Sequence, residues 1–143
     1  MNHHSGAKSV TKAAASVAAS ATHSHEIDTA GFKYASIDVI FSPFTAATSS
    51  YASVLKVQES DASGSGQADV SGLSITAGAG STTGANVGAV ARFNIDLRGR
   101  KRYLTVVTSP GNTVAVATAA RLSKAEQHAV TASEAGVNNV ASL

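Results

Sequence analysis

Large apolar side chains fall at every second position along several stretches in the middle of the chain. In the stretch 89–97 the alternation runs through five positions, with Phe93 and Ile95 on one face and Arg92 and Asn94 on the other. A period of two residues is typical of a β-strand with one buried face. This pattern, together with the content of β-branched residues, predicts strands over residues 33–41, 53–59, 69–76, 89–97, 103–108 and 114–122.

Residues that favour turns separate the predicted strands. Pro43 has no amide hydrogen to donate, so the strand 33–41 is expected to end just before it. Segments 98–101 and 110–112 predict turns, because Gly99 can adopt a positive φ and the Pro-Gly-Asn sequence favours a bend. Short strands with turns between them predict an all-β fold. We expect a small antiparallel β-sandwich, jelly-roll-like or Greek-key, with extended N- and C-terminal arms.

The two ends of the chain are poor in large apolar residues. Of the 30 Leu, Ile, Val and Phe residues, 23 lie in residues 31–123. Residues 1–30 and 124–143 therefore bury too little apolar surface to offset the entropy of ordering them alone. We predict an N-terminal arm (1–30), a β-sandwich domain (31–123) and a C-terminal arm (124–143), with the arms ordered only against a partner. The Ala-rich stretch 13–21 is too polar at its centre for a secretory signal.

Composition narrows the possible functions. Ala, Ser, Thr and Gly make up 73 of the 143 residues, and the formal net charge is +2. The absence of cysteine excludes disulfides, thiolate metal sites and a cysteine nucleophile. No apolar run approaches the ~18 residues of a membrane-spanning helix, so no membrane association is expected. The chain has room for one domain but not for a large enzyme core.

Candidate catalytic and metal-binding residues are few. The sequence has no GxSxG, HExxH or Walker motif, and its carboxylates are scattered over strand edges and loops. His23 and His25 would face the same side of an extended arm, but two ligands make a weak metal site. We expect both imidazoles to be solvated. The chain is therefore predicted not to be an enzyme and to need no metal or cofactor.

A cluster of positive charge is the strongest local feature of the sequence. Arg98, Arg100, Lys101 and Arg102 are four of the eleven cationic residues and lie within five positions. Such a cluster can bind nucleic acid, bind an acidic patch on another protein, or form a hairpin turn whose charges pair with Asp96. Because the net charge is only +2, nucleic acid is the less favoured partner.

Four segments of the chain share a further pattern of strands and one basic turn. They are RFNIDLRGRKRYL at 92–104, FKYASIDV at 32–39, VLKVQES at 54–60 and AARLSKAEQ at 119–127. Together they resemble the small capsid decoration proteins (cement or head auxiliary proteins) of tailed bacteriophages. The resemblance implies a non-enzymatic virion protein on the outside of an icosahedral head, assembled in the host cytoplasm. The partners it implies are the major capsid protein and further copies of the chain, as a dimer or trimer.

The resemblance also implies a role for the cationic residues. They would contact the capsid or a neighbouring subunit, and residues 1–30 would act as a clamp. The expected interface residues are Arg98, Arg100, Lys101 and Arg102 on the basic segment, with Lys8 and Lys12 on the arm. Two alternatives remain open. One is a β-sandwich module that binds host carbohydrate on a virion surface, for which Tyr51 is the candidate aromatic platform. The other is an internal DNA-binding virion protein, which rests on the basic segment alone.

Overall fold

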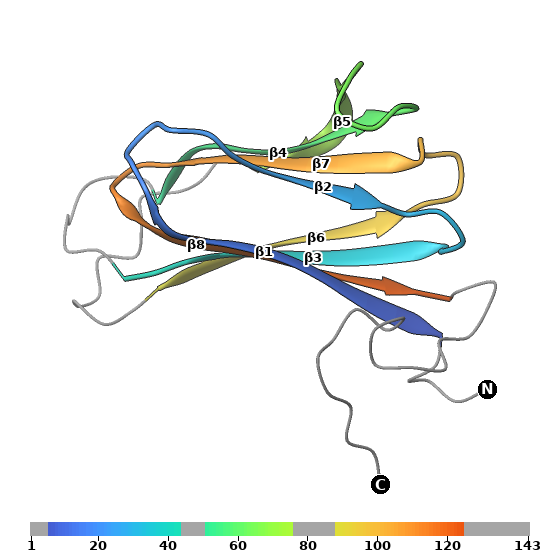
Figure 1. Cartoon of the computed structure of the whole chain (residues 1–143), viewed down its shortest axis with the longest axis horizontal. Coiled ribbons are helices and arrows are strands. Elements are labelled where there is room, and N and C mark those ends of the chain that lie inside the picture. The colour runs from blue at the N-terminus through green and yellow to red at the C-terminus, as the bar shows by residue number, and fades with distance from the viewer. Residues whose placement is uncertain (1–5, 44–50, 76–87, 125–143) are drawn as a thin grey trace, which may run out of the picture.

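The computed structural model describes residues 6–43, 51–75 and 88–124. Within these ranges the chain forms eight β-strands and no helix, and the strands build two four-stranded sheets stacked face to face (Figure 1). The predicted all-β sandwich is therefore confirmed. The strands are β1 (Ala7–Val17), β2 (His23–Asp28), β3 (Tyr34–Phe41), β4 (Ala52–Ser60), β5 (Ala68–Ser74), β6 (Ala89–Asp96), β7 (Tyr103–Pro110) and β8 (Val114–Ser123).

The order of the strands identifies the kind of sandwich. Sheet A has the order β1-β8-β3-β6, sheet B has the order β2-β7-β4-β5, and every pairing is antiparallel. The pairs β1·β8, β2·β7, β3·β6 and β4·β5 join the first half of the chain to the second half in inverse order. Wrapping such a paired ribbon around one core gives an eight-stranded jelly roll. Of the two topologies expected for the sandwich, the chain adopts the jelly roll.

The six strands predicted from alternation are all present as β3 to β8. Each begins and ends within two residues of its predicted bounds. In β3, Ile37, Val39 and Phe41 are buried, while the side chains between them are half-buried or exposed. The strand ends at Phe41, before Pro43, as predicted, and the backbone N–H of Ser42 still donates to the carbonyl of Ala115 at 2.9 Å.

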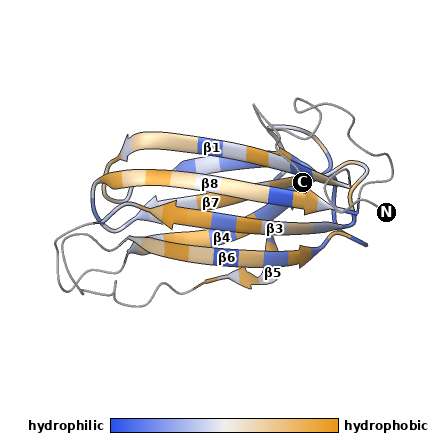
Figure 2. Cartoon of the chain, turned by 90° about the horizontal axis from the view of Figure 1, so that it is seen from below, coloured by the Kyte–Doolittle hydropathy of each residue, from blue (hydrophilic) through white to orange (hydrophobic). Residues whose placement is uncertain are grey.

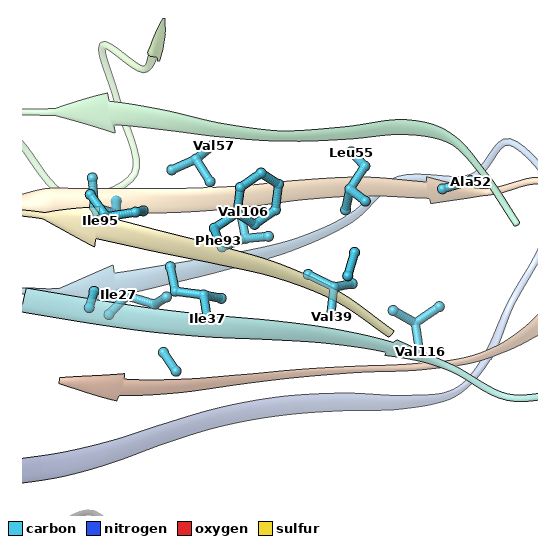
Figure 3. Packing of buried hydrophobic residues seen from close by; sticks show 14 of the residues in the cluster. Ile27, Ile37, Val39, Ala52, Leu55, Val57, Phe93, Ile95, Val106 and Val116 are labelled. Atoms are coloured by element: carbon cyan, nitrogen blue, oxygen red, sulfur yellow. The ribbon is translucent and has the colours of Figure 1, made fainter. Parts of the chain in front are cut away.

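The core lies between the two sheets and is built from the inward faces of both. Figure 3 shows Ile37 and Val39 of β3 and Phe93 of β6 facing side chains such as Leu55 of β4 and Val106 of β7. All five are at most 3 % exposed. Fully burying a side chain of this size stabilises a fold by about 1.5–3 kcal/mol relative to leaving it in water. The sandwich therefore has a continuous apolar centre despite the high content of small residues.

The predicted N-terminal arm is wrong over residues 7–28. β1 pairs with β8 from Ala7↔Ser123 onwards, and β2 pairs with β7 through all six of its residues. The sandwich therefore begins at Ala7 and not at residue 31. The hydrogen-bond ladders to β8 and β7 hold these strands, and β2 adds the fully buried Ile27. A count of large apolar residues cannot detect such backbone pairing. Residues 1–5 and 125–143, which include most of the predicted C-terminal arm, lie outside the described residues.

The basic segment 98–102 also differs from its predicted form. It was expected to be a hairpin turn, but β6 belongs to sheet A and β7 to sheet B, so the segment crosses from one sheet to the other. Gly99 has φ +79° within it, which confirms the predicted use of a positive φ. The backbone N–H of Arg100 donates to the carbonyl of Leu97 at 3.0 Å and closes the turn. The cationic side chains consequently lie at one end of the sandwich, near both sheets.

Candidate functional site

The basic turn is paired with carboxylates of the same chain. The guanidinium of Arg98 binds both carboxylate oxygens of Asp96, with Nε 2.9 Å from Oδ1. Arg102 binds Asp28 in the same two-pronged way, with Nε–Oδ1 at 2.9 Å and Nη2–Oδ2 at 2.7 Å. Two parallel N–H···O bonds are the strongest form of the arginine–carboxylate contact. The predicted pairing with Asp96 is therefore confirmed for Arg98, although the segment is not the hairpin turn of that interpretation.

The two remaining cations of the turn have their own partners. Nζ of Lys101 lies 2.8 Å from Oδ2 of Asp61, and Nη1 of Arg100 lies 3.7 Å from Oε1 of Glu59. Glu59 also accepts a hydrogen bond from the backbone N–H of Lys101 at 3.2 Å. The four carboxylates come from β2, β4, β6 and the turn after β4. The turn thus ties together elements of both sheets.

Two of these ion pairs favour the charged form of their carboxyl groups, those of Asp96 and Asp28. Hydrogen bonds from Arg98 lower the pKa of Asp96 to about 2, and hydrogen bonds from Arg102 lower the pKa of Asp28. The four cationic side chains of the turn thus each lie against a carboxylate of the same chain. A turn balanced in this way is a poor match for phosphate, whose binding relies on unpaired cations that displace counterions. Its arginines stay accessible, since the Arg98 side chain is 67 % exposed.

Two tyrosines flank the basic turn and are covered by cations. The guanidinium carbon of Arg98 lies 5.6 Å from the ring centroid of Tyr34, and Nζ of Lys124 lies 5.0 Å from the same ring. Arg102 lies 5.0 Å from the ring of Tyr103. Cations within about 6 Å of a ring face are attracted to it. At this end of the sandwich both tyrosine rings are therefore in contact with cationic side chains.

The two lysines predicted as interface residues lie on β1. Lys8 is close enough to Asp28 to help lower the pKa of that carboxyl, so it lies near the basic turn. Lys12 instead donates from Nζ to the backbone carbonyl of Ser24 at 2.7 Å and lies beside the histidines of β2. The structure therefore brings Lys8, but not Lys12, towards the basic turn.

The histidines of β2 point into the sandwich. His23 and His25 are 6 % and 5 % exposed, so the prediction that they are solvated is wrong. Nε2 of His23 and Nδ1 of His25 have no hydrogen-bond partner among the described residues. Burial and, second, the charge of Lys12 lower both pKa values, that of His25 to about 4. Both imidazoles are therefore neutral at pH 7. Among the described residues no three His, Asp or Glu side chains are grouped closely enough to hold a metal ion.

The outer face of sheet A carries an apolar surface that the sequence analysis did not single out. Val90, Ile40, Ala117 and Ala13 are neighbours in the register of β6, β3, β8 and β1, and so form one row across all four strands. Val90 is 63 % exposed and Ile40 40 % exposed. We call these four residues the apolar row. A shallow hollow of about 390 Å³ lies beside it, lined also by Ala15 and other small residues.

The same face becomes polar towards the other end of the sheet. Arg92 binds Asp38 in the next row, with Nε–Oδ1 at 2.6 Å and Nη2–Oδ2 at 2.9 Å. One row further, the hydroxyl of Ser36 donates to the amide oxygen of Asn94 at 2.9 Å. Figure 2 shows a single blue segment within each of β8 and β3, with orange residues on both sides of it. The signal in the sequence was the presence of Ile and Val on the outward face of two alternating strands.

The aromatic side chain considered for carbohydrate binding is part of the core boundary. Tyr51 packs against Phe41 with ring centroids 5.4 Å apart and an interplanar angle of 59°. It is partly buried against the core cluster. A sugar platform needs an open ring face. Tyr51 therefore gives the carbohydrate hypothesis no support.

The fold and its surfaces define the class of the protein as an eight-stranded jelly-roll β-sandwich. Comparison of the chain with protein-family models gives no match, and comparison with curated proteins gives none either. No helix in the described part of the chain is long and apolar enough to cross a membrane. A narrower assignment must therefore come from the chain's own surfaces.

Proposed function

We propose that this chain is a non-enzymatic structural protein of a bacteriophage virion. It binds the outer surface of the icosahedral head and links neighbouring major capsid proteins there, after synthesis in the host cytoplasm. The observation that supports this most directly is the apolar row on the open face of sheet A. Contiguous exposed apolar side chains on a small domain mark sites of protein–protein contact. The jelly-roll fold is compatible with the proposal because it recurs in viral capsid domains.

The apolar row and its surroundings have the composition expected at the centre of a protein–protein interface. Val90 and Ile40 are the large exposed side chains, and the alanines beside them let a partner approach close to the backbone. The ion pair of Arg92 with Asp38 borders the row and supplies a polar rim. Interfaces commonly combine an apolar centre with a polar rim. In this proposal the row makes the main capsid contact, and sheet B faces away from the capsid.

In this proposal the cationic residues of the basic turn contribute less to capsid binding than the apolar row does. Arg98, Arg100, Lys101 and Arg102 each have a carboxylate partner in the chain, so a capsid carboxylate would have to compete with an existing ion pair. Exposed pairs exchange partners at little cost. The basic turn is therefore a rim contact that sets orientation and not the main source of affinity.

The proposal is tested by binding of variants to empty capsids. Val90→Glu places a charge in the apolar row and should abolish co-sedimentation with capsids. Val54→Glu is the matched control, because Val54 is 37 % exposed on β4 of sheet B. It should bind as the unaltered protein does. Equal binding of both variants, or equal loss in both, would contradict the assignment of the sheet A face.

A further inference from the structure

The four edge strands of the sandwich differ in how they are protected against pairing with another chain. β1 carries Lys8 and Lys12 and a break in register between Ala14 and Val17. β5 has a break in its register with β4 and a positive φ at Gly72. β2 is short, and Lys12 covers its edge by binding the carbonyl of Ser24. Lysines, bulges and short length are the usual devices that block edge-to-edge association.

β6 is not short and has neither a lysine nor a bulge, and its charged residues, Arg92 and Asp96, have opposite signs. It pairs with β3 through all eight residues without a break, and it contains no proline, glycine or lysine. Its other edge forms the border of sheet A (Figure 2) and has no strand partner among the described residues. An unprotected regular edge is a template for a further strand.

The hydrogen bonds of β3 show which groups of β6 face that open edge. The N–H of Leu97 donates to the carbonyl of Lys33 at 2.9 Å, so residues 97, 95, 93 and 91 direct their backbone groups towards β3. The backbone groups of Val90, Arg92 and Asn94 then point to the open edge. The side chains of these three residues are exposed on the outer face.

The charges of β6 select one register for an antiparallel copy of the same strand. With Asn94 opposite Asn94 of a second copy, Arg92 of each copy lies opposite Asp96 of the other. Opposite charges in directly facing positions stabilise a strand pair, and like charges destabilise it. A register centred on Arg92 would instead place two arginines opposite each other. The strand is therefore complementary to itself in the Asn94-centred register. Arg92 and Asp96 also pair within their own chain, with Asp38 and Arg98, and these exposed pairs can be shared with the second copy.

We propose that two copies of this chain associate through the open edge of β6, antiparallel and centred on Asn94, to form one continuous eight-stranded sheet. A twofold axis through Asn94 relates the copies, so each contributes the same surface. This inference does not rest on the proposed function. It names the homo-oligomer interface and places it on the open edge of β6, next to the basic turn, since Asp96 also binds Arg98.

The first test uses the full chain in sedimentation velocity over the micromolar range. The unaltered protein should show a concentration-dependent monomer–dimer equilibrium. Asn94→Pro removes the N–H that faces the open edge without removing a hydrogen bond to β3, and prolines are tolerated at such edge positions. It should be monomeric. Asn94→Ala is the matched control, because it loses the side-chain contact with Ser36 but keeps the N–H, and it should still dimerise.

The second test exchanges charges and does not depend on how a proline is accommodated. Arg92→Glu alone and Asp96→Arg alone each place like charges opposite each other, and each should weaken dimerisation by roughly tenfold or more. An equimolar mixture of the two variants restores two opposite-charge pairs and should form a heterodimer. A monomeric unaltered protein, equal dimerisation of Asn94→Pro and Asn94→Ala, or a mixture that stays monomeric would each overturn the proposal.

Discussion

Acid should weaken the sandwich through the buried histidines of β2 before it affects the carboxylates. His25 and His23 lie inside the sandwich, where each is close to the other and to the ammonium of Lys12 on β1, and Thr108 of β7 pairs with His23. None of these groups is a carboxylate that would stabilise a protonated imidazole. A proton on His25 would instead add a second positive charge beside Lys12. Protonation therefore favours separation of β1 from β2.

The size of the effect follows from the pKa of His25. A drop from 6.5 to about 4 corresponds to about 3 kcal/mol at ~1.4 kcal/mol per pKa unit. Water at the boundary of β1 and β2 screens part of this, so we expect about 2 kcal/mol. Because the pKa is lowered in the folded state, the unfolded chain binds more protons between pH 6.5 and pH 4. The stability that is present above pH 6.5 is lost as the pH falls towards 4.

The assay is urea unfolding of the unaltered protein and of His25→Gln at pH 7 and at pH 5. The free energy of unfolding of the unaltered protein should fall by about 1 kcal/mol or more between the two pH values, with His23 adding to the loss. In His25→Gln the fall should be smaller by about 1 kcal/mol. The pKa values of Asp28, Asp38 and Asp96 are lowered, so these carboxyls stay charged in this window. An equal fall in both proteins would refute the reasoning.

Two further predictions concern the core and the basic turn. Phe93→Ala should lower the free energy of unfolding by about 3–5 kcal/mol in urea titrations, because it leaves a cavity between the sheets, whereas Val90→Ala on the exposed face of the same strand should change it by less than about 0.5 kcal/mol. The unaltered chain should show little salt-dependent binding to duplex DNA in fluorescence anisotropy, and Asp28→Asn with Asp61→Asn should strengthen that binding by freeing Arg102 and Lys101. Strong DNA binding by the unaltered chain, equal to that of the double variant, would contradict the pairing argument.

The sequence predicts those strands in which large apolar and polar side chains alternate. β3 and β6 alternate large apolar and polar residues, so their bounds and their buried faces follow from a local pattern. β1 is different, because its residues are mostly alanine, serine and threonine and have no such period. Its place is decided by the free edge of β8, which lies about a hundred residues away at Val114–Ser123. Only a non-local pairing could reveal it.

In the candidate site, too, contacts between residues close in the sequence can be predicted, whereas contacts between distant residues cannot. The cluster at 98–102 is visible in the sequence, and so is Asp96, which lies two residues before Arg98. Asp28 lies 74 positions from Arg102, and its pairing depends on the jelly-roll order that brings β2 beside β7. The inward position of His25 can be predicted from the sequence once residues 23–28 are treated as a strand, because His25 then shares a face with Ile27. It was missed because the segment was interpreted as an arm.

The small residues of sheet A have a structural consequence for its outer face. Ala13 and Ala117 extend no further than Cβ, so the outer face of β1 and β8 is flat and a partner can approach the backbone closely. Flat alanines supply contact area but little energy each, while a few large side chains usually carry most of the affinity of an interface. On this face those side chains are Val90 and Ile40. Removing one of them should therefore weaken capsid binding more than replacing either alanine with serine.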